Sequence, residues 1–302
     1  MHVSAALGEQ LKGENLTEIL DLSAAGATSF SDGDLPVWNC ELLLKALQYT
    51  SGHGVRVFQN ARDLHLAANT HMNEGISSTN LGLRGEPTLS EVLTIKRDLD
   101  ILRYAGGQLH FSKVSSKEAV DLIEEGKNQG LDITADVAIH HLIFTDSTIK
   151  DFDSNYKTIP PFRTEQDQLA LIDAVKSGVI DAICSNHRPQ DLESKQLEFD
   201  LAEPGAISQQ TFYSNLLSLA EQIPFETLVE RVTNGPRKVL GIDRSVISEG
   251  MPAKLTVLDP ERKWVLNQNS NLSKSRNSPF WDEELVGKVV GTINGTHCNW
   301  IN

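Results

Sequence analysis

The chain has 302 residues, 39% hydrophobic and 23% charged, which is ordinary for a folded protein with one large domain and a small one. Its formal net charge of −14 argues against nucleic-acid or anionic membrane partners, because like charges repel. No apolar run is long enough for a transmembrane helix, and the N-terminus lacks the features of a signal peptide. The cysteines Cys40, Cys184 and Cys298 fit small, buried, reduced thiols of a cytoplasmic protein.

Short β-branched runs alternate with amphipathic helical patterns up to about Gly250. In chain order we predict a strand at 2–7, a helix at 15–25, a strand at 27–30, a helix at 38–49, a strand at 55–58 and helices at 61–70 and 87–104. There follow a strand at 108–112, a helix at 116–129, a strand at 131–137, an irregular stretch to Pro161, a helix at 164–177, a strand at 179–185 and helices at 208–220 and 225–240. This alternation implies a parallel sheet, either open or closed into a barrel. No glycine-rich phosphate loop follows a strand, so no nucleotide cofactor is expected.

The pattern changes at Gly250. Residues 254–258 and 286–293 are rich in β-formers, Asn294-Gly295 is a hairpin signal, and the polar stretch 267–277 resembles a surface loop. We therefore predict an α/β barrel domain over residues 1–249 and strands of a small β-domain over 250–302. About 50 residues are too few to build a separate core without further strands.

Polar side chains follow the predicted strands. In a parallel barrel such side chains point into one mouth, where these folds carry out chemistry. The residues in question are Asp32, Asp34, Asn60, Lys113, His140, His141, Asn186 and His187.

Four segments, taken together and in this order, resemble the dihydroorotases of the metal-dependent amidohydrolase superfamily. They are 26–33, 139–142 with 160–163, 183–190 with Lys195, Phe199 and Gly205, and 234–241 with 250–253. The resemblance implies a (β/α)8 TIM-type barrel and the reversible ring closure of carbamoyl-aspartate to dihydroorotate in pyrimidine biosynthesis. In that family bound zinc polarises the carbonyl and activates hydroxide, while an aspartate carries the proton.

The positions that the resemblance assigns to metal ligands depart from the family's pattern. The acidic turn keeps Asp32, but the second acidic position is Gly33, and Asp34 comes one residue late. Asn60 and Lys113 stand where the family has ligand histidines, and an ammonium repels a divalent cation. We therefore expect no bound zinc and no other cofactor.

The positions for proton transfer and substrate contact are also changed. Asn186 replaces the proton-carrying aspartate and has no titratable proton near neutral pH, while Ile159 and Gln190 stand at substrate-contact positions. The family's first His-x-His pair is not found, and the resemblance begins partway into the barrel. These observations suggest an N-terminally truncated chain whose open edge an oligomeric partner could otherwise cover.

Several polar residues of the expected mouth are retained: His110, His140, His141, Arg163 and His187. Each has a structural alternative. The histidines could be hydrogen-bonded scaffold residues, His187 could anchor a loop, and Arg163 could hold the rim through a carboxylate. Asp32 could cap a turn, or Lys113 could pair with it and so replace the charge of a metal.

Three functional hypotheses remain open. The first is a non-catalytic dihydroorotase-like protein with an assembly role. Inactive homologues in this family scaffold aspartate carbamoyltransferase, so the resemblance implies that enzyme as the partner. The second is an active zinc dihydroorotase that draws its ligands from residues such as His110, His140 or His187. The third is a hydrolase of another cyclic amide. Zinc content and a dihydroorotate hydrolysis assay separate them.

Overall fold

The computed structural model describes residues 2–301. Within that range, six parallel strands form one open, curled sheet in the order β1-β2-β3-β6-β7-β8. The predicted parallel α/β architecture is thus confirmed, with β1 and β8 as the edge strands. The strands are β1 (Val3–Ala5), β2 (Ala27–Phe30), β3 (Val57–Asn60), β6 (Leu109–Ser112), β7 (Ile133–Ala138) and β8 (Ala182–Cys184).

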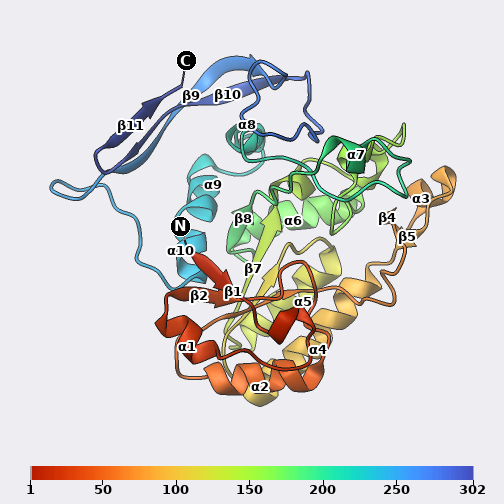
Figure 1. Ribbon diagram of the computed structural model, residues 1–302, viewed down its shortest axis with the longest axis vertical. Helices are drawn as coiled ribbons and strands as arrows, with labels where there is room; N and C mark the ends of the chain where they lie inside the picture. The colour runs from red at the N-terminus through yellow and green to blue at the C-terminus, as the bar shows by residue number, and fades with distance from the viewer. Residues whose placement is uncertain (1, 302) are drawn as a thin grey trace.

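Helices follow the strands and pack beside one another in chain order, with α2 next to α4, α4 next to α5 and α5 next to α6 (Figure 1). Their apolar faces and the sheet enclose one continuous core that includes Phe30, Leu43, Ile95 and Phe111. The helices are α1 (Ile19–Ala24), α2 (Cys40–Thr50), α3 (Ile76–Leu81), α4 (Leu89–Ala105), α5 (Lys117–Asn128), α6 (Glu165–Ser177), α7 (Leu192–Lys195), α8 (Phe212–Ser218), α9 (Phe225–Val232) and α10 (Asn234–Val239).

Side-chain caps fix where the best-predicted helices begin. The Ser116 hydroxyl accepts a hydrogen bond from the Ala119 amide at the start of α5. At the start of α6, Thr164 and Asp167 accept from each other's backbone amides in a capping box. Since these side chains satisfy amides that lack partners within the helix, the sequence determines these boundaries closely.

The C-terminal part forms a separate three-stranded antiparallel sheet of β9 (Lys254–Val265), β10 (Glu284–Asn294) and β11 (His297–Trp300). The predicted hairpin turn lies between β10 and β11, with Gly295 at a φ of 61°. Figure 1 shows this sheet beside α8 and apart from the parallel sheet. The Ser214 hydroxyl of α8 donates to the Gly287 carbonyl at 2.6 Å and joins the two parts.

The strands β4 (Met72–Asn73) and β5 (Gly85–Glu86) form a short parallel pair, and α3 lies between them in the sequence. The long segments after β1 and β7 contain the 3-10 helices η1 (Glu9–Leu11), η2 (Ile139–Leu142), η3 (Asp146–Thr148) and η4 (Ser154–Tyr156). The sequence pattern did not predict these short elements, nor α3 and α7. None of the helices within residues 2–301 is long and apolar enough to cross a membrane.

Four predicted helices were wrong in whole or in part, and one of them, predicted at 208–220, covers only Phe212–Ser218. Residues 61–70 form turns, because the Asp63 carboxylate accepts the amides of His65 and Leu66. The helix predicted at 15–25 begins only at Ile19, since the Thr17 hydroxyl donates to the Ala6 carbonyl.

The helix predicted at 225–240 divides at Thr233 into α9 and α10. Pro236, three residues later, has no amide to continue the α9 ladder, which explains the break. The prediction of buried cysteines was also wrong for Cys40 and Cys298, which are exposed, while Cys184 is intermediate.

Candidate functional site

Lys113, Asp34 and Arg188 join three strand ends across the mouth of the parallel sheet. The Lys113 ammonium lies 2.7 Å from Asp34 Oδ1, and Arg188 Nη1 lies 2.8 Å from Oδ2 of the same carboxylate. Burial raises the pKa of Asp34, but Lys113 and Arg188 outweigh it and hold that pKa below its ordinary value. The carboxylate therefore stays ionised between two cations.

Asp32 and Asn60 bind backbone atoms. Asp32 Oδ1 accepts the amides of Leu7 at 3.1 Å and Gly8 at 2.7 Å, and Asn60 Nδ2 donates to the Gly33 carbonyl. Asp32 thus fixes the turn after β1. The hypothesis that Lys113 pairs with Asp32 was wrong: the partner is Asp34, the acidic residue displaced by one position in the sequence.

The space next to the ion pair is small. A cavity of about 10 Å³ is bounded by Asp34, Asn60, Lys113, Ile159 and Arg163, among others. That volume corresponds to roughly one water molecule. A cyclic amide does not fit in this cavity, although a neighbouring cavity of about 290 Å³ shares Arg62, Glu86 and Ile159 with it.

Two mouth residues have unusual backbone conformations. Lys113 has a φ of 58° and Asn186 a φ of 45°, although neither is glycine. Asparagine tolerates the left-handed region, whereas for lysine it is strained. Backbone conformations of this kind cluster at functional sites.

His110 is a buried scaffold residue beneath the mouth. Its Nδ1 lies 2.9 Å from Thr134 Oγ1 and its Nε2 2.9 Å from Asp136 Oδ2. Asp136 also accepts the Lys113 amide at 2.9 Å. Burial raises the pKa of Asp136, but the bonds from His110 and Lys113 bring it below the ordinary value. Asp136 was not predicted from the sequence, although Thr134 and Asp136 occupy alternate positions of β7 and therefore face the same side of the sheet.

Arg163 lies at the centre of a buried polar network. Its guanidinium donates to Ser115 Oγ at 3.1 Å, to Asn73 Oδ1 at 3.1 Å and to the Glu86 carbonyl at 2.8 Å. It also lies 3.5 Å from the Glu86 carboxylate, which Arg62 binds at 2.6 Å. This geometry agrees with the structural alternative for Arg163.

Glu91 completes this network from the start of α4. It is buried and accepts hydrogen bonds from the Ser115 amide at 2.8 Å and from both the Ser115 and Ser116 hydroxyls. Burial raises the pKa of Glu91 against the opposing effect of Arg163. Neither Glu86 nor Glu91 was identified from sequence, because an acidic residue near a helix start is usually solvated.

His140 and His141 are buried away from the mouth cavity. His140 packs between Phe144 and Phe280, and within residues 2–301 neither of its ring nitrogens has a hydrogen-bond partner. His141 Nε2 reaches the Pro160 carbonyl at 3.1 Å, while its Nδ1 is unpartnered. Burial lowers the pKa of His140 to about 4 and that of His141 to about 3, so both are neutral near pH 7.

The segment after β8 holds the remaining predicted residues. Asn186 Nδ2 lies 3.5 Å from the Ile159 carbonyl, and Gln190 Nε2 donates to the Pro204 carbonyl at 2.9 Å. His187 anchors the next segment, because its Nδ1 accepts the amides of Ser208 and Gln209. The structure thus brings Asp34, Asn60, Lys113, Ile159 and Arg163 together and leaves His187 facing a different cavity.

The side chains present do not fit a zinc site. Zinc binds neutral imidazole, thiolate or carboxylate. The two carboxylates of the mouth, Asp34 and Glu86, are each paired with cationic side chains, and no imidazole or thiolate is among the described residues that line this cavity. Across residues 2–301, no three His, Cys, Asp or Glu side chains are grouped so that they could hold a metal ion.

A Lys113→Met variant tests the role of the central ion pair. It should lower the free energy of unfolding by about 1 kcal/mol, because both charges are partly solvated. Urea denaturation measures the change, with Lys176→Met, at an exposed helix pair, as the control that stays near wild type. A Lys113→Met protein as stable as wild type would contradict a structural role for the pair.

The chain is similar in sequence to known dihydroorotases. A family model described as dihydro-orotase-like matches residues 3–119. The dihydroorotase of Geotalea daltonii is 36% identical over 290 residues, covering 95% of this chain and 68% of that protein. The dihydroorotase of Aquifex aeolicus is 36% identical over 284 residues, covering 93% of this chain and 67% of that protein.

Solved structures show the same fold at lower identity. The L-hydantoinase (dihydropyrimidinase) from Arthrobacter aurescens superposes with a TM-score of 0.82 at 20% identity, over 100% of this chain and 71% of that one. The dihydropyrimidinase from Brevibacillus agri gives a TM-score of 0.80 at 18% identity, over 98% of this chain and 68% of that one. At this identity the similarity concerns the fold alone.

Proposed function

Because the chain belongs to the dihydroorotase family, we propose that it is a non-catalytic dihydroorotase-like protein of pyrimidine biosynthesis with an assembly role alongside aspartate carbamoyltransferase. One observation carries the proposal. The Lys113 ammonium stands at a position that the resemblance assigns to a metal ligand, and it pairs with Asp34 at 2.7 Å across the mouth.

The chemistry of the remaining positions supports the same conclusion. Zinc-assisted hydrolysis needs a bound cation to polarise the carbonyl and a group that carries a proton. Asn60 offers an amide already directed at the Gly33 carbonyl, and Asn186 cannot exchange a proton near neutral pH. Loss of an acid-base group alone commonly costs about 10²–10⁴ in rate.

The assembly role rests on the family resemblance and on what the chain retains. The core is continuous from Leu7 to Leu228, and Arg163 lies in a buried hydrogen-bond network, so the scaffold around the mouth is well packed. A well-packed α/β scaffold that lacks the family's reactive groups is suited to presenting a surface. The resemblance identifies aspartate carbamoyltransferase as the partner to test first.

The first experiment measures metal and activity on one purified sample. We expect zinc far below one equivalent by elemental analysis and no dihydroorotate hydrolysis above background, with or without added zinc. One equivalent of zinc with clear turnover would establish an active zinc dihydroorotase instead. Turnover of hydantoin or dihydrouracil, but not dihydroorotate, would indicate another cyclic-amide hydrolase.

A second experiment tests the assembly role separately. The protein and aspartate carbamoyltransferase from the same organism should co-elute in size-exclusion chromatography and change the carbamoyltransferase's elution volume. Lys113→Met should still bind, because the proposed role does not use the mouth. An absence of association at micromolar concentrations would overturn the assembly role and leave the metal result untouched.

A further inference from the structure

A cavity of about 440 Å³ opens between the segment after β8 and the C-terminal sheet. Its apolar walls are Ile207, Trp264, Leu266, Val289 and Ile301. Pockets of this size at the junction of two parts of a protein are typical sites for small molecules. The ion pair of the mouth does not line this cavity, so the two sites are separate.

Trp264 presents the carbon atoms of its indole to this cavity. Its Nε1 donates to Ser214 Oγ at 3.1 Å and to the Gly287 carbonyl at 3.0 Å, and neither of these residues lines the cavity. The N–H edge of the ring is therefore directed away from the cavity, and the hydrocarbon part of the ring lines it. An indole fixed in this way offers a flat apolar wall against which a second ring can pack.

Polar side chains of the lining are already hydrogen-bonded within the protein. Gln210 Nε2 donates to the Ser270 carbonyl at 2.6 Å, and its Oε1 accepts the Leu272 amide at 2.9 Å. Asn271 Nδ2 donates to the Ser273 carbonyl, and its Oδ1 accepts the amide of the same residue. A polar group of a ligand would have to compete with these bonds, which favours an apolar ligand.

The lining also offers little to balance the charge of a ligand. No aspartate, glutamate or arginine is among the described residues that line the cavity. Lys288 lines it, but this ammonium is engaged in an interaction of its own. Burial lowers the pKa of His187, which keeps that imidazole neutral near pH 7. Moving a charged ligand from water into this cavity is therefore unfavourable.

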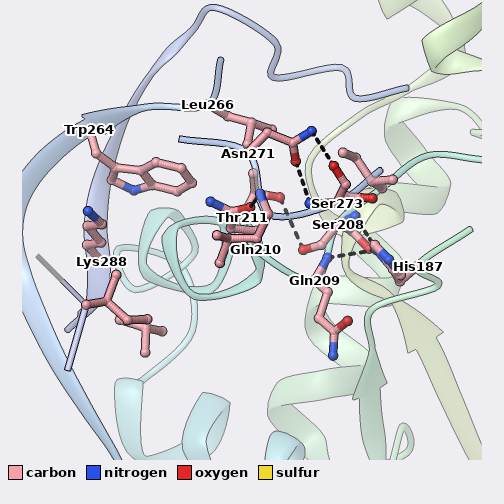
Figure 2. A pocket seen from close by; sticks show the side chains of 14 residues that line it. His187, Ser208, Gln209, Gln210, Thr211, Trp264, Leu266, Asn271, Ser273 and Lys288 are labelled. Carbon is pink, nitrogen blue, oxygen red and sulfur yellow. Dashed lines mark hydrogen bonds between the residues drawn. The ribbon is translucent and has the colours of Figure 1, made fainter. Parts of the chain in front are cut away.

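We propose that this cavity binds an uncharged aromatic molecule of about two fused rings, which packs against the indole of Trp264. Figure 2 shows Trp264 at one end of the cavity and His187 at the other, with Gln210 and Thr211 between them. Leu272 also lines the cavity, although 79% of it is exposed, and an apolar ligand removes part of this surface from water. The proposal does not depend on whether the mouth is catalytic.

Isothermal titration calorimetry with three ligands of one shape tests the site. The ligands are 2-acetonaphthone, which is uncharged, 2-naphthoate, which is an anion, and 2-naphthamidine, which is a cation at pH 7. We expect saturable one-to-one binding of the ketone with a Kd below about 1 mM, and binding at least about tenfold weaker for both charged analogues. No saturation by about 1 mM, or equal affinity for either charged analogue, would overturn the proposal.

Matched variants locate the binding site. Val289→Trp fills the cavity from β10 and should abolish binding, since tryptophan is well tolerated in strands. Val286→Trp adds the same bulk to the same strand at an exposed position outside the cavity, so it should leave the Kd unchanged. Trp264→Leu should weaken the ketone severalfold, while Ser214 Oγ still donates to the Gly287 carbonyl.

Thermal unfolding of each variant checks that the fold is intact. Undiminished binding by Val289→Trp, or equal weakening by Val289→Trp and Val286→Trp, would show that the ketone binds elsewhere and would overturn the proposal. Wild-type affinity of Trp264→Leu for the ketone would contradict the inferred contact between the two rings.

Discussion

Arg163→Met should lower the free energy of unfolding by about 3–5 kcal/mol, the usual cost of removing one partner from a buried ionic network. The substitution leaves Ser115 Oγ, Asn73 Oδ1 and the Glu86 carbonyl without their donor. It also leaves the Glu86 carboxylate with Arg62 as its remaining cation. Urea denaturation followed by circular dichroism measures the loss.

Two further variants define its origin. Arg163→Lys keeps the charge but not the planar fork, so its stability should lie between those of wild type and Arg163→Met. Arg103→Met removes an arginine from an exposed pair with Asp100 and should stay near wild type. A loss below about 1 kcal/mol for Arg163→Met would show that the network is not the stabilising unit inferred from its contacts.

Acidification should destabilise the protein through His140 and His141. Their folded pKa values of about 4 and about 3 lie below the ordinary value of 6.5, so the unfolded chain binds protons first as the pH falls. Their contribution to stability is therefore complete above pH 6.5 and declines as the pH falls toward 4. Each histidine should cost about 1.4 kcal/mol per pH unit in that window.

His140→Leu isolates the effect of one histidine. Asp98 acts in the opposite direction, because burial raises its pKa to about 6 and its folded form takes up a proton first, which favours folding as the pH falls below 6. Asp98 contributes equally to the free energies of unfolding of wild type and His140→Leu, so its contribution cancels in their difference. As the pH falls from 7 to 4.5, we expect the free energy of unfolding of His140→Leu to rise by about 2–3 kcal/mol relative to that of wild type. Parallel pH profiles for the two proteins would contradict this prediction.

The sequence predicted the elements whose local signals agree with their packing. Residues 116–129 and 164–177 combine a capping side chain with an apolar face, and the observed helices differ from these predictions by at most one residue at either end. Residues 61–70 have a comparable spacing of apolar residues, but the Asp63 side chain competes for the first amides. Periodicity alone does not reveal that competition.

The sequence predicted which residues lie at the candidate site better than it predicted which of them contact one another. Their positions after predicted strands identified Lys113 and Asp34 as site residues. Their ion pair could not be predicted, because they lie 79 positions apart in the sequence and meet only through the curl of the sheet. Glu91 was not predicted, because nothing in the neighbouring sequence distinguishes it from a solvent-exposed glutamate. The burial of His140 without hydrogen-bond partners was likewise not predictable, because Phe280, which packs against it, comes from the C-terminal part of the chain.

The ion pair between Lys113 and Asp34 also bears on the evolutionary reversibility of the proposed function. A change of Lys113 to histidine alone would remove the pair, and with Asn60 and Asn186 still in place it would gain no metal. The first step back toward a zinc site thus lowers stability without restoring activity. Selection would act against such an intermediate, so the ion pair makes a return to a zinc site by single substitutions unfavourable.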